Sequence, residues 1–248
     1  MRAIIALLIF ILMTGCTQYK KIVYLQEEDI NEQKVAALES YLLRPGDMLH
    51  VKLYSPDQNV NSMFNLEGND NRSNYNDISI YLTGFLIDDN NRIELPIIGE
   101  IDLKGSTLAS AKEIITDSVS NYIREATVNI KLLSYQVTVF GEVGAPGVKS
   151  IYRSQSTIFD VLSSSGDIST LGDRTDVVVL RKSGDVQQKL HIDLTDMASL
   201  GNPAYNIYPN DVIYVKPLKA KIFRDNIPII SLTLTTLTTF LLILNYIR

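Results

Sequence analysis

The sequence predicts an α+β protein of two compact units, followed by one apolar helix at the C-terminus. Three observations support this fold class. Short apolar runs alternate with turn residues from residue 78 onward, which is typical of strands. Residues 108–123 and 158–165 each follow a threonine and have apolar residues at helical spacing, which predicts capped helices. Residues 226–247 carry no formal charge, as expected of a helix that crosses a membrane.

The N-terminus has the pattern of a secretory signal. Arg2 precedes an apolar run at residues 3–13, and the small residues Thr14 and Gly15 follow. The run is too short to span a bilayer. It leads to Cys16, the only cysteine of the chain, so no internal disulfide can form.

Small residues before a cysteine resemble the lipobox of bacterial lipoproteins, in which the cysteine is lipidated, for example with palmitate, and becomes the mature N-terminus. We therefore predict a signal peptide at 1–15 and a tether at 16–40 that is lipidated at Cys16. Residues 31–40 of this tether could become helical. The alternative is an ordinary signal peptide that contains a cysteine by chance.

The composition excludes several classes of function. The net charge is −5 and basic residues form no cluster, so nothing indicates nucleic acid as a partner. His50 and His191 lie in separate units, and two histidines alone make no convincing zinc site. GEVGAPGVKS lacks the spacing of a phosphate-binding loop. We expect no metal, no cofactor and no enzymatic activity, although a carboxylate pair of glycosidase type is spatial and cannot be read from sequence.

The first unit, predicted at 41–133, begins with the turn Arg44-Pro45-Gly46-Asp47, which has Pro at the second position and Gly at the third. A strand leads away from it, and residues 55–76 predict a long loop. The remaining predicted elements are a strand at 78–87, a turn at 88–91, two short strands around Pro96 and Gly99, a helix capped by Thr107, and a strand at 126–133.

The second unit, predicted at 134–217, opens with a hairpin whose turn contains Gly141, Pro146 and Gly147. The rest of its predicted elements are a helix between Thr157 and Gly166, paired strands at 177–181 and 187–192, a short helical piece capped by Asp193 and ending at Gly201, and a strand after the turn at 208–211. Hairpin, helix and further strands in this order are β-grasp-like.

A connector at 218–226 leads to a predicted transmembrane helix at 227–248. The uncharged stretch is about 33 Å long as a helix, which matches a hydrocarbon core of about 30 Å. Pro228 suits a first helical turn. Ser231, Thr235, Thr238 and Thr239 lie on one face, which we call the hydroxyl stripe. Such a stripe favours packing of membrane helices against each other. The alternative is a plain single-pass anchor.

Three segments together resemble the polysaccharide biosynthesis/export family, the outer-membrane exporters of the Wza type. LRPGDMLHVKLYSPD (43–57) and the stretch GFLIDD to SNYI (84–123) are similar to its export domain. VTVFGEVGAPGVKSI (137–151), TIFDVLSSSGDIS (157–169) and YPNDVIYV (208–215) are similar to its soluble-ligand-binding β-grasp module. The segments occur in the family's order.

The resemblance implies a lipoprotein of the outer membrane with a periplasmic body. It implies a homo-oligomeric ring, commonly an octamer, whose C-terminal helices form a barrel for capsular polysaccharide or exopolysaccharide. The partner beneath would be an inner-membrane chain-length co-polymerase, often a tyrosine kinase. The hydroxyl stripe would face the lumen, and Arg44 to Asp47 would shape the turn of the export domain. Only one β-grasp module is found where longer members carry two, so a shorter ring is expected.

Two other readings of the sequence stay open. One is a lipid-anchored periplasmic module that binds glycan without forming a pore. The other is a carbohydrate-active enzyme. A variant of the channel hypothesis places the C-terminal helix in the inner membrane.

Overall fold

The computed structural model describes residues 22–26, 36–37, 40–57, 59, 61, 64–65, 83–123, 125–183 and 186–247. Cys16 and the signal peptide predicted at 1–15 lie outside the described residues. So do most of the tether predicted at 16–40 and of the loop predicted at 55–76, and residues 78–82 of a predicted strand.

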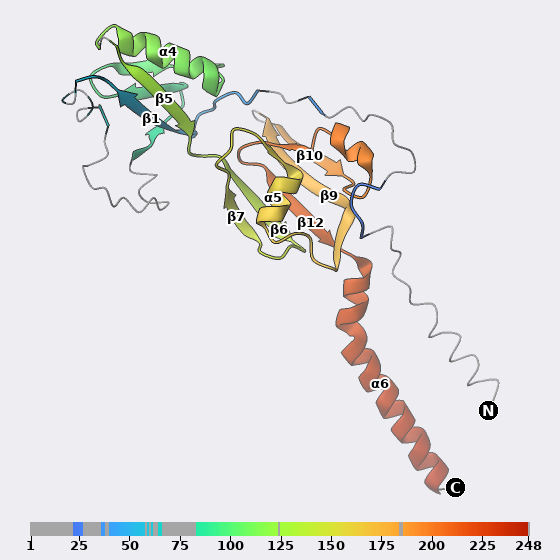
Figure 1. Cartoon of the computed structure of the whole chain (residues 1–248). Coiled ribbons are helices and arrows are strands. Elements are labelled where there is room, and N and C mark those ends of the chain that lie inside the picture. The colour runs from blue at the N-terminus through green and yellow to red at the C-terminus, as the bar shows by residue number, and fades with distance from the viewer. Residues whose placement is uncertain are drawn as a thin grey trace.

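The described chain is an α+β protein with one long C-terminal helix, which confirms the predicted fold class. Two units, each with its own core, are followed by the helix α6 (Lys219–Ile247). Figure 1 shows the three parts in a row, with the second unit in the middle and α6 projecting away from it.

The first unit is a three-stranded antiparallel sheet with a helix packed on it. Its strand order is β2 (Phe85–Leu86), β1 (Met48–Tyr54), β5 (Thr127–Leu132). The hairpin of β3 (Arg92–Leu95) and β4 (Gly99–Asp102) lies beside it.

Alternation along β1 sets the core of this unit. Leu49, Val51 and Leu53 are buried while the residues between them are more exposed, the period-2 pattern of a strand with one covered face. The helix α4 (Leu108–Ser120) contributes Ala111, Ile115 and Val119 to the same core. Thr107 caps α4 as predicted, and Ser110 completes a capping box.

The second unit is a mixed five-stranded sheet in the order β10-β9-β12-β6-β7. Its main elements are β6 (Gln136–Gly141), β7 (Gly147–Ser150), α5 (Ile158–Ser164), β9 (Gly172–Ser183), β10 (Val186–Ile192) and β12 (Val212–Pro217). Two short strands, β8 (Ser156–Thr157) and β11 (Asn206–Ile207), pair with each other. The last strand, β12, lies in the centre, parallel to β6 and antiparallel to β9.

One face of this sheet is covered by α5 (Figure 1). Val139, Val179 and Ile213 come from three neighbouring strands, and they pack with Val161 and Leu162 of the helix in one buried cluster. Burial of each such side chain contributes about 1.5–3 kcal/mol, so this cluster holds the central parallel pair in place.

Gly141 ends β6 at a point where no larger residue fits. Its φ is +97°, and a Cβ there would lie 2.1 Å from the carbonyl oxygen of Val215. The close approach lets β12 run alongside the end of β6.

The structure corrects four expectations about local structure. Within the predicted strand at 78–87, only Phe85–Leu86 is a strand among the described residues. The short helix η2 (Met197–Gly201) is a 3-10 helix capped by Asp196, because Asp193 instead accepts hydrogen bonds from Thr195. Three residues of the stretch expected to become helical, residues 36, 37 and 40, are not in a helix.

The fourth correction concerns the start of the C-terminal helix. Pro228 is not in its first turn, because α6 begins at Lys219 and includes most of the stretch predicted as a connector. Pro228 therefore lies inside the helix, where its missing N–H removes one backbone hydrogen bond.

Candidate functional site

The root of α6 is tied to the second unit by an ion pair. Lys221, in the first turn of the helix, donates to Glu142, the residue after β6. Ser169 donates to the other carboxylate oxygen of Glu142 at 3.1 Å, and the N–H of Leu218 donates to the carbonyl of Leu171 at 2.7 Å. The hydrogen bond from Lys221 lowers the pKa of Glu142 below its ordinary value.

The N-terminal segment 22–26 docks on the same part of the second unit. The Tyr24 hydroxyl donates to Asp167 at 2.5 Å, and the guanidinium carbon of Arg174 lies 5.1 Å from the Tyr24 ring. Phe159 of α5 packs edge-on against the same ring, with centroids 5.9 Å apart. Burial, followed by the hydrogen bond to Asp167, raises the pKa of Tyr24 to about 12.

The N-terminal segment and the start of α6 thus meet one loop, residues 166–171. Asp167 accepts a hydrogen bond from Tyr24, Ser169 donates to Glu142, the partner of Lys221, and Leu171 accepts from Leu218. Arg174, which is buried, donates to the carbonyls of Ile168 and Ser169 and so fixes the loop between them. This brings the N-terminal segment and the start of α6 to the same end of the second unit.

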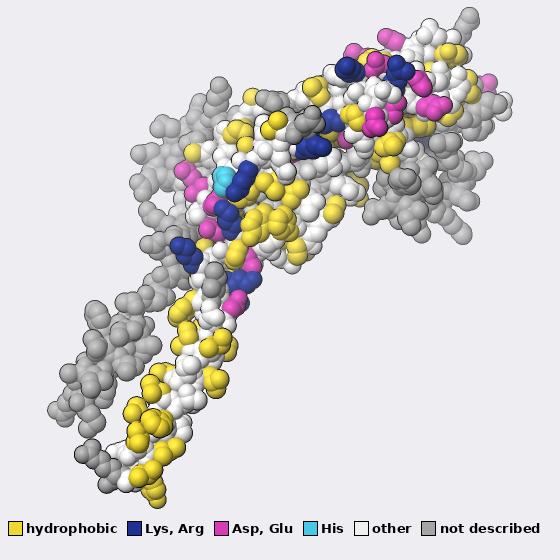
Figure 2. All heavy atoms as spheres, turned by 180° about the vertical axis from the view of Figure 1, so that it is seen from behind, with side chains coloured by type: hydrophobic (Ala, Val, Ile, Leu, Met, Phe, Trp, Pro, Cys, Tyr) yellow, Lys and Arg dark blue, Asp and Glu magenta, His cyan; other side chains and the backbone are white. Residues whose placement is uncertain are grey.

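The helix α6 has 29 residues, and its most apolar window has a mean hydropathy of 2.1 with none of it buried. By length and composition it can cross a membrane. Figure 2 shows hydrophobic side chains along its whole length, with charged side chains gathered where it leaves the second unit.

The hydroxyl stripe satisfies its own hydrogen bonds. Ser231 donates to the carbonyl of Pro228 at 2.9 Å, Thr238 to Thr235 at 2.9 Å, and Thr239 to Thr235 at 2.8 Å. Thr235 donates to Ser231 at 2.5 Å. Because each donor is used within the helix, the stripe costs little in an apolar surrounding while its oxygens can still accept hydrogen bonds.

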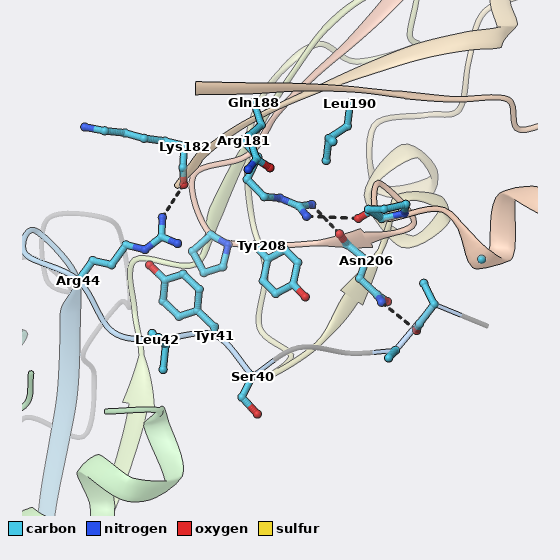
Figure 3. A pocket seen from close by; sticks show the side chains of 15 residues that line it. Ser40, Tyr41, Leu42, Arg44, Arg181, Lys182, Gln188, Leu190, Asn206 and Tyr208 are labelled. Carbon is cyan, nitrogen blue, oxygen red and sulfur yellow. Dashed lines mark hydrogen bonds between the residues drawn. The ribbon is translucent and has the colours of Figure 1, made fainter. Parts of the chain in front are cut away.

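A cleft of about 630 Å³ lies between the two units. Tyr41 and Arg44 line it from the first unit, and Arg181, Gln188 and Tyr208 line it from the second (Figure 3). The volume lies within the range of small-molecule sites, about 300–1,000 Å³.

Arg181 on β9 is held by several acceptors. Its guanidinium donates to both carboxylate oxygens of Asp211, at 2.7–3.2 Å, and to the carbonyls of Pro203 and Asn206. Its guanidinium carbon lies 4.3 Å from the centroid of the Tyr208 ring. The side chain of Asp211 is only 1% exposed; burial raises its pKa and Arg181 opposes the rise. Arg181 is therefore a structural arginine of the cleft wall.

Arg44 reaches the cleft from the other unit. Its Nη1 donates to the carbonyl of Lys182 at 2.6 Å, and its guanidinium carbon lies 5.4 Å from the Tyr41 ring centroid. The Tyr41 hydroxyl donates to the buried Asp47 at 2.9 Å, and Ser134 donates to the same carboxylate at 3.1 Å. Burial, followed by the charge of Asp47, raises the pKa of Tyr41.

The two turns at the cleft are built alike. In each, a Pro is followed by a residue with positive φ, Gly46 at +89° and Asn210 at +66°, and then by an aspartate. Asp47 accepts from the backbone N–H of Arg44 at 3.0 Å, and Asp211 accepts from that of Tyr208 at 2.9 Å. The predicted turn thus forms, and its first residue also sends a side chain into the cleft.

The remaining predicted residues fall in two places. Gly141, Pro146 and Gly147 lie at the end of β6 and in the β6–β7 connection, away from the cleft lining. The stripe residues Ser231, Thr235, Thr238 and Thr239 lie on α6. Sequence reasoning missed Tyr41, Arg181, Gln188 and Tyr208. One sequence feature could have indicated the cleft. RPGD (44–47) and YPND (208–211) are similar turns, and these two turns meet at the cleft.

The comparison with known families concerns the first unit. Residues 35–133 match the sequence model of the polysaccharide biosynthesis/export proteins. This range contains the Arg44–Asp47 turn and all of β1 to β5 with α4. It confirms the resemblance seen in LRPGDMLHVKLYSPD and the segment after it, and gives the chain a role in polysaccharide export at the cell envelope. Residues 35–133 therefore form a polysaccharide biosynthesis/export domain.

Proposed function

We propose that this protein is a non-enzymatic subunit of a homo-oligomeric outer-membrane channel that exports capsular polysaccharide or exopolysaccharide. The export domain at residues 35–133 supports the substrate class. The strand order of the second unit, with β12 parallel to β6 at its centre, supports a single β-grasp module at 134–217. The exposed apolar helix α6 supports a membrane-crossing part.

The observation that carries the proposal is the shared loop at 166–171. Its Asp167 bonds to Tyr24, its Leu171 bonds to Leu218 just before α6, and its Ser169 supports Glu142, the partner of Lys221. Cys16 is six residues before Ile22, a separation that a fully extended chain spans in about 20 Å. A lipid on Cys16 and the helix α6 would therefore enter the same membrane from one end of the body.

The mechanism is passive. Identical copies arranged around an axis would bring their α6 helices together, with the stripe of hydroxyls on the inside. The hydroxyl oxygens accept weak, replaceable hydrogen bonds from sugars, and tight binding would stall transport. Synthesis beneath the ring, at an inner-membrane chain-length co-polymerase or tyrosine kinase, supplies the drive.

The proposal is tested by the mass and shape of the full-length protein extracted in mild detergent, measured by native mass spectrometry and negative-stain imaging. A closed ring is the expected result, and its mass gives the number of subunits. A second sample truncated after Leu218 is expected to lose the ring. A monodisperse monomer that stays monomeric with the inner-membrane partner would contradict the channel.

A second candidate is a lipid-anchored glycan-binding module without a pore. The cleft between the units favours it, because the cleft offers aromatic rings and an arginine without any assembly. Membrane-bound monomers that bind glycan would support this second candidate. Polymer degradation by the purified protein, abolished by one Asp or Glu substitution, would instead support an enzyme.

A further inference from the structure

The cleft presents two tyrosine rings from different units. Tyr41 comes from the segment before the first turn, and Tyr208 opens the second turn. Figure 3 shows both rings at the cleft, with Gln188 and Leu190 of β10 above them in this view. Such rings are rigid apolar surfaces with polar edges, and they suit ligands that have both apolar faces and hydroxyls, as sugar rings do.

The two arginines of the cleft differ in how many hydrogen bonds their side chains make. Arg181 is engaged by Asp211 and by two backbone carbonyls. Within the part of the chain that the structure describes, Arg44 makes one side-chain hydrogen bond, to the carbonyl of Lys182, and no ion pair. A guanidinium has five N–H donors, so Arg44 keeps most of its donors for another acceptor.

The charged residues that line the cleft in the described part of the chain are all basic. Arg44, Arg181 and Lys182 line the cleft, and none of its described lining residues is acidic. Two described carboxylates contact lining residues: Asp211 is paired with Arg181, and Asp47 accepts hydrogen bonds from Tyr41 and Ser134. A planar guanidinium pairs with a carboxylate through two parallel hydrogen bonds, and the guanidinium of Arg44 lies over the ring of Tyr41.

We propose that this cleft binds a carboxylate-bearing sugar unit of the exported polysaccharide. Arg44 pairs with the carboxylate, the rings of Tyr41 and Tyr208 pack on the sugar, and Gln188 bonds to its hydroxyls. This inference rests on the proposed function, because a polymer that is exported past the body meets this cleft. It goes further in naming an acidic polymer as the cargo and one arginine as the group that recognises it.

Binding at this cleft is weak and depends on charge. The site is open on one side and draws its selectivity from a single charge-assisted contact. Loss of such a contact weakens binding about tenfold or more. Salt screens the interaction, because Arg44 is only half-buried.

The test measures binding of short galacturonic acid oligomers to the full-length protein in detergent. Ligand-observed saturation-transfer NMR suits weak binding, and galactose oligomers of the same length are the neutral comparison. Three variants are compared with the wild type. Arg44→Gln removes the proposed contact, and Gln188→Ala is a second change in the cleft that breaks no hydrogen bond among the described residues. Arg92→Gln is the matched control, since it removes an exposed arginine of the first unit that pairs with Glu100.

The expected result is binding of the acidic oligomer with little binding of the neutral one. Arg44→Gln should weaken acidic binding about tenfold, Gln188→Ala should weaken it severalfold, and Arg92→Gln should leave it unchanged. Equal binding of both oligomers, no binding of either, or equal losses in Arg44→Gln and Arg92→Gln would overturn the inference. If the wild-type protein forms a ring but binds no acidic oligomer, the inference about the cleft is wrong and the channel proposal stands. If it binds the acidic oligomer as a monomer, the channel proposal is wrong and the inference about the cleft stands.

Discussion

Glu142 and Lys221 join the sheet of the second unit to the helix α6, although they lie 79 positions apart in the chain. Glu142 follows strand β6, and Lys221 lies in the first turn of α6. The pair is supported by Ser169, whose hydroxyl donates to the same carboxylate. The ionised carboxylate of Glu142 therefore helps to hold the first turn of α6 against the body.

A pH dependence of the α6 root follows from this pair. The hydrogen bond from Lys221 lowers the pKa of Glu142 below its ordinary value of 4.5. Because its pKa is lowered in the folded protein, the Glu142 carboxyl contributes stability at pH values above its ordinary pKa. That contribution is lost as the pH falls through the lowered pKa. In hydrogen–deuterium exchange, Glu142→Gln should speed exchange around residues 218–224 at neutral pH, and the difference from wild type should vanish in acid.

The control for this experiment is Glu94→Gln, an exposed glutamate of β3, which should not change exchange at the root of α6. Equal exchange of wild type and Glu142→Gln at neutral pH would show that the pair does not hold the helix.

The close approach at Gly141 can be separated from its backbone conformation. Gly141→Ala places a methyl group 2.1 Å from the Val215 carbonyl oxygen at a φ of +97°, whereas Gly46→Ala has a similar φ of +89° and open space around the new Cβ. Gly46→Ala should cost about 1–2 kcal/mol of unfolding free energy. Gly141→Ala should cost about 2 kcal/mol more, because strands β6 and β12 must separate. Equal losses in denaturant unfolding would argue against the steric role.

The ion pair of Arg181 and Asp211 stabilises the cleft wall. Asp211→Asn leaves a largely buried guanidinium without its charge partner, since the side chains are 15% and 1% exposed. Breaking such a pair costs about 3–5 kcal/mol, and thermal unfolding followed by circular dichroism should show the loss. Asp89→Asn, in an exposed turn, should stay within about 0.5 kcal/mol of wild type. A similar melting temperature for all three proteins would mean that the pair is not needed for the fold.

Local signals predicted most elements of the fold correctly. Thr107 and Thr157 cap the helices that follow them, and alternation of apolar residues locates β1, β5 and β12. The start of α6 was placed too late because Pro228 is favourable in a first turn, while the charged residues before it continue the helix by contacts with the body. The first turn of α6 is held by the contact of Lys221 with Glu142, a residue far away in the sequence.

The cleft could not be predicted in the same way. Arg181 and Asp211 are 30 positions apart, and Arg44 and Lys182 are 138 positions apart. Their contacts depend on how β9 pairs with β12 and on how the two units meet. Neither arrangement can be predicted from a local sequence pattern. The two Pro-containing turns were predicted, because Pro followed by Gly or Asn marks a turn locally. The close approach of Gly141 to Val215 was not predicted, because Val215 is far away in the chain.

The central claim, that α6 lines an aqueous path, is tested most directly by thiol labelling along the helix. Cys16 is the only native cysteine, so single cysteines can be introduced into the membrane-embedded protein and probed with a water-soluble maleimide. Thr235→Cys and Thr238→Cys lie on the hydroxyl stripe, and Thr233→Cys and Thr236→Cys lie off it at similar depth. The account predicts fast labelling of the first pair and slow labelling of the second. Equal labelling of the two pairs, or none of the first, would contradict it.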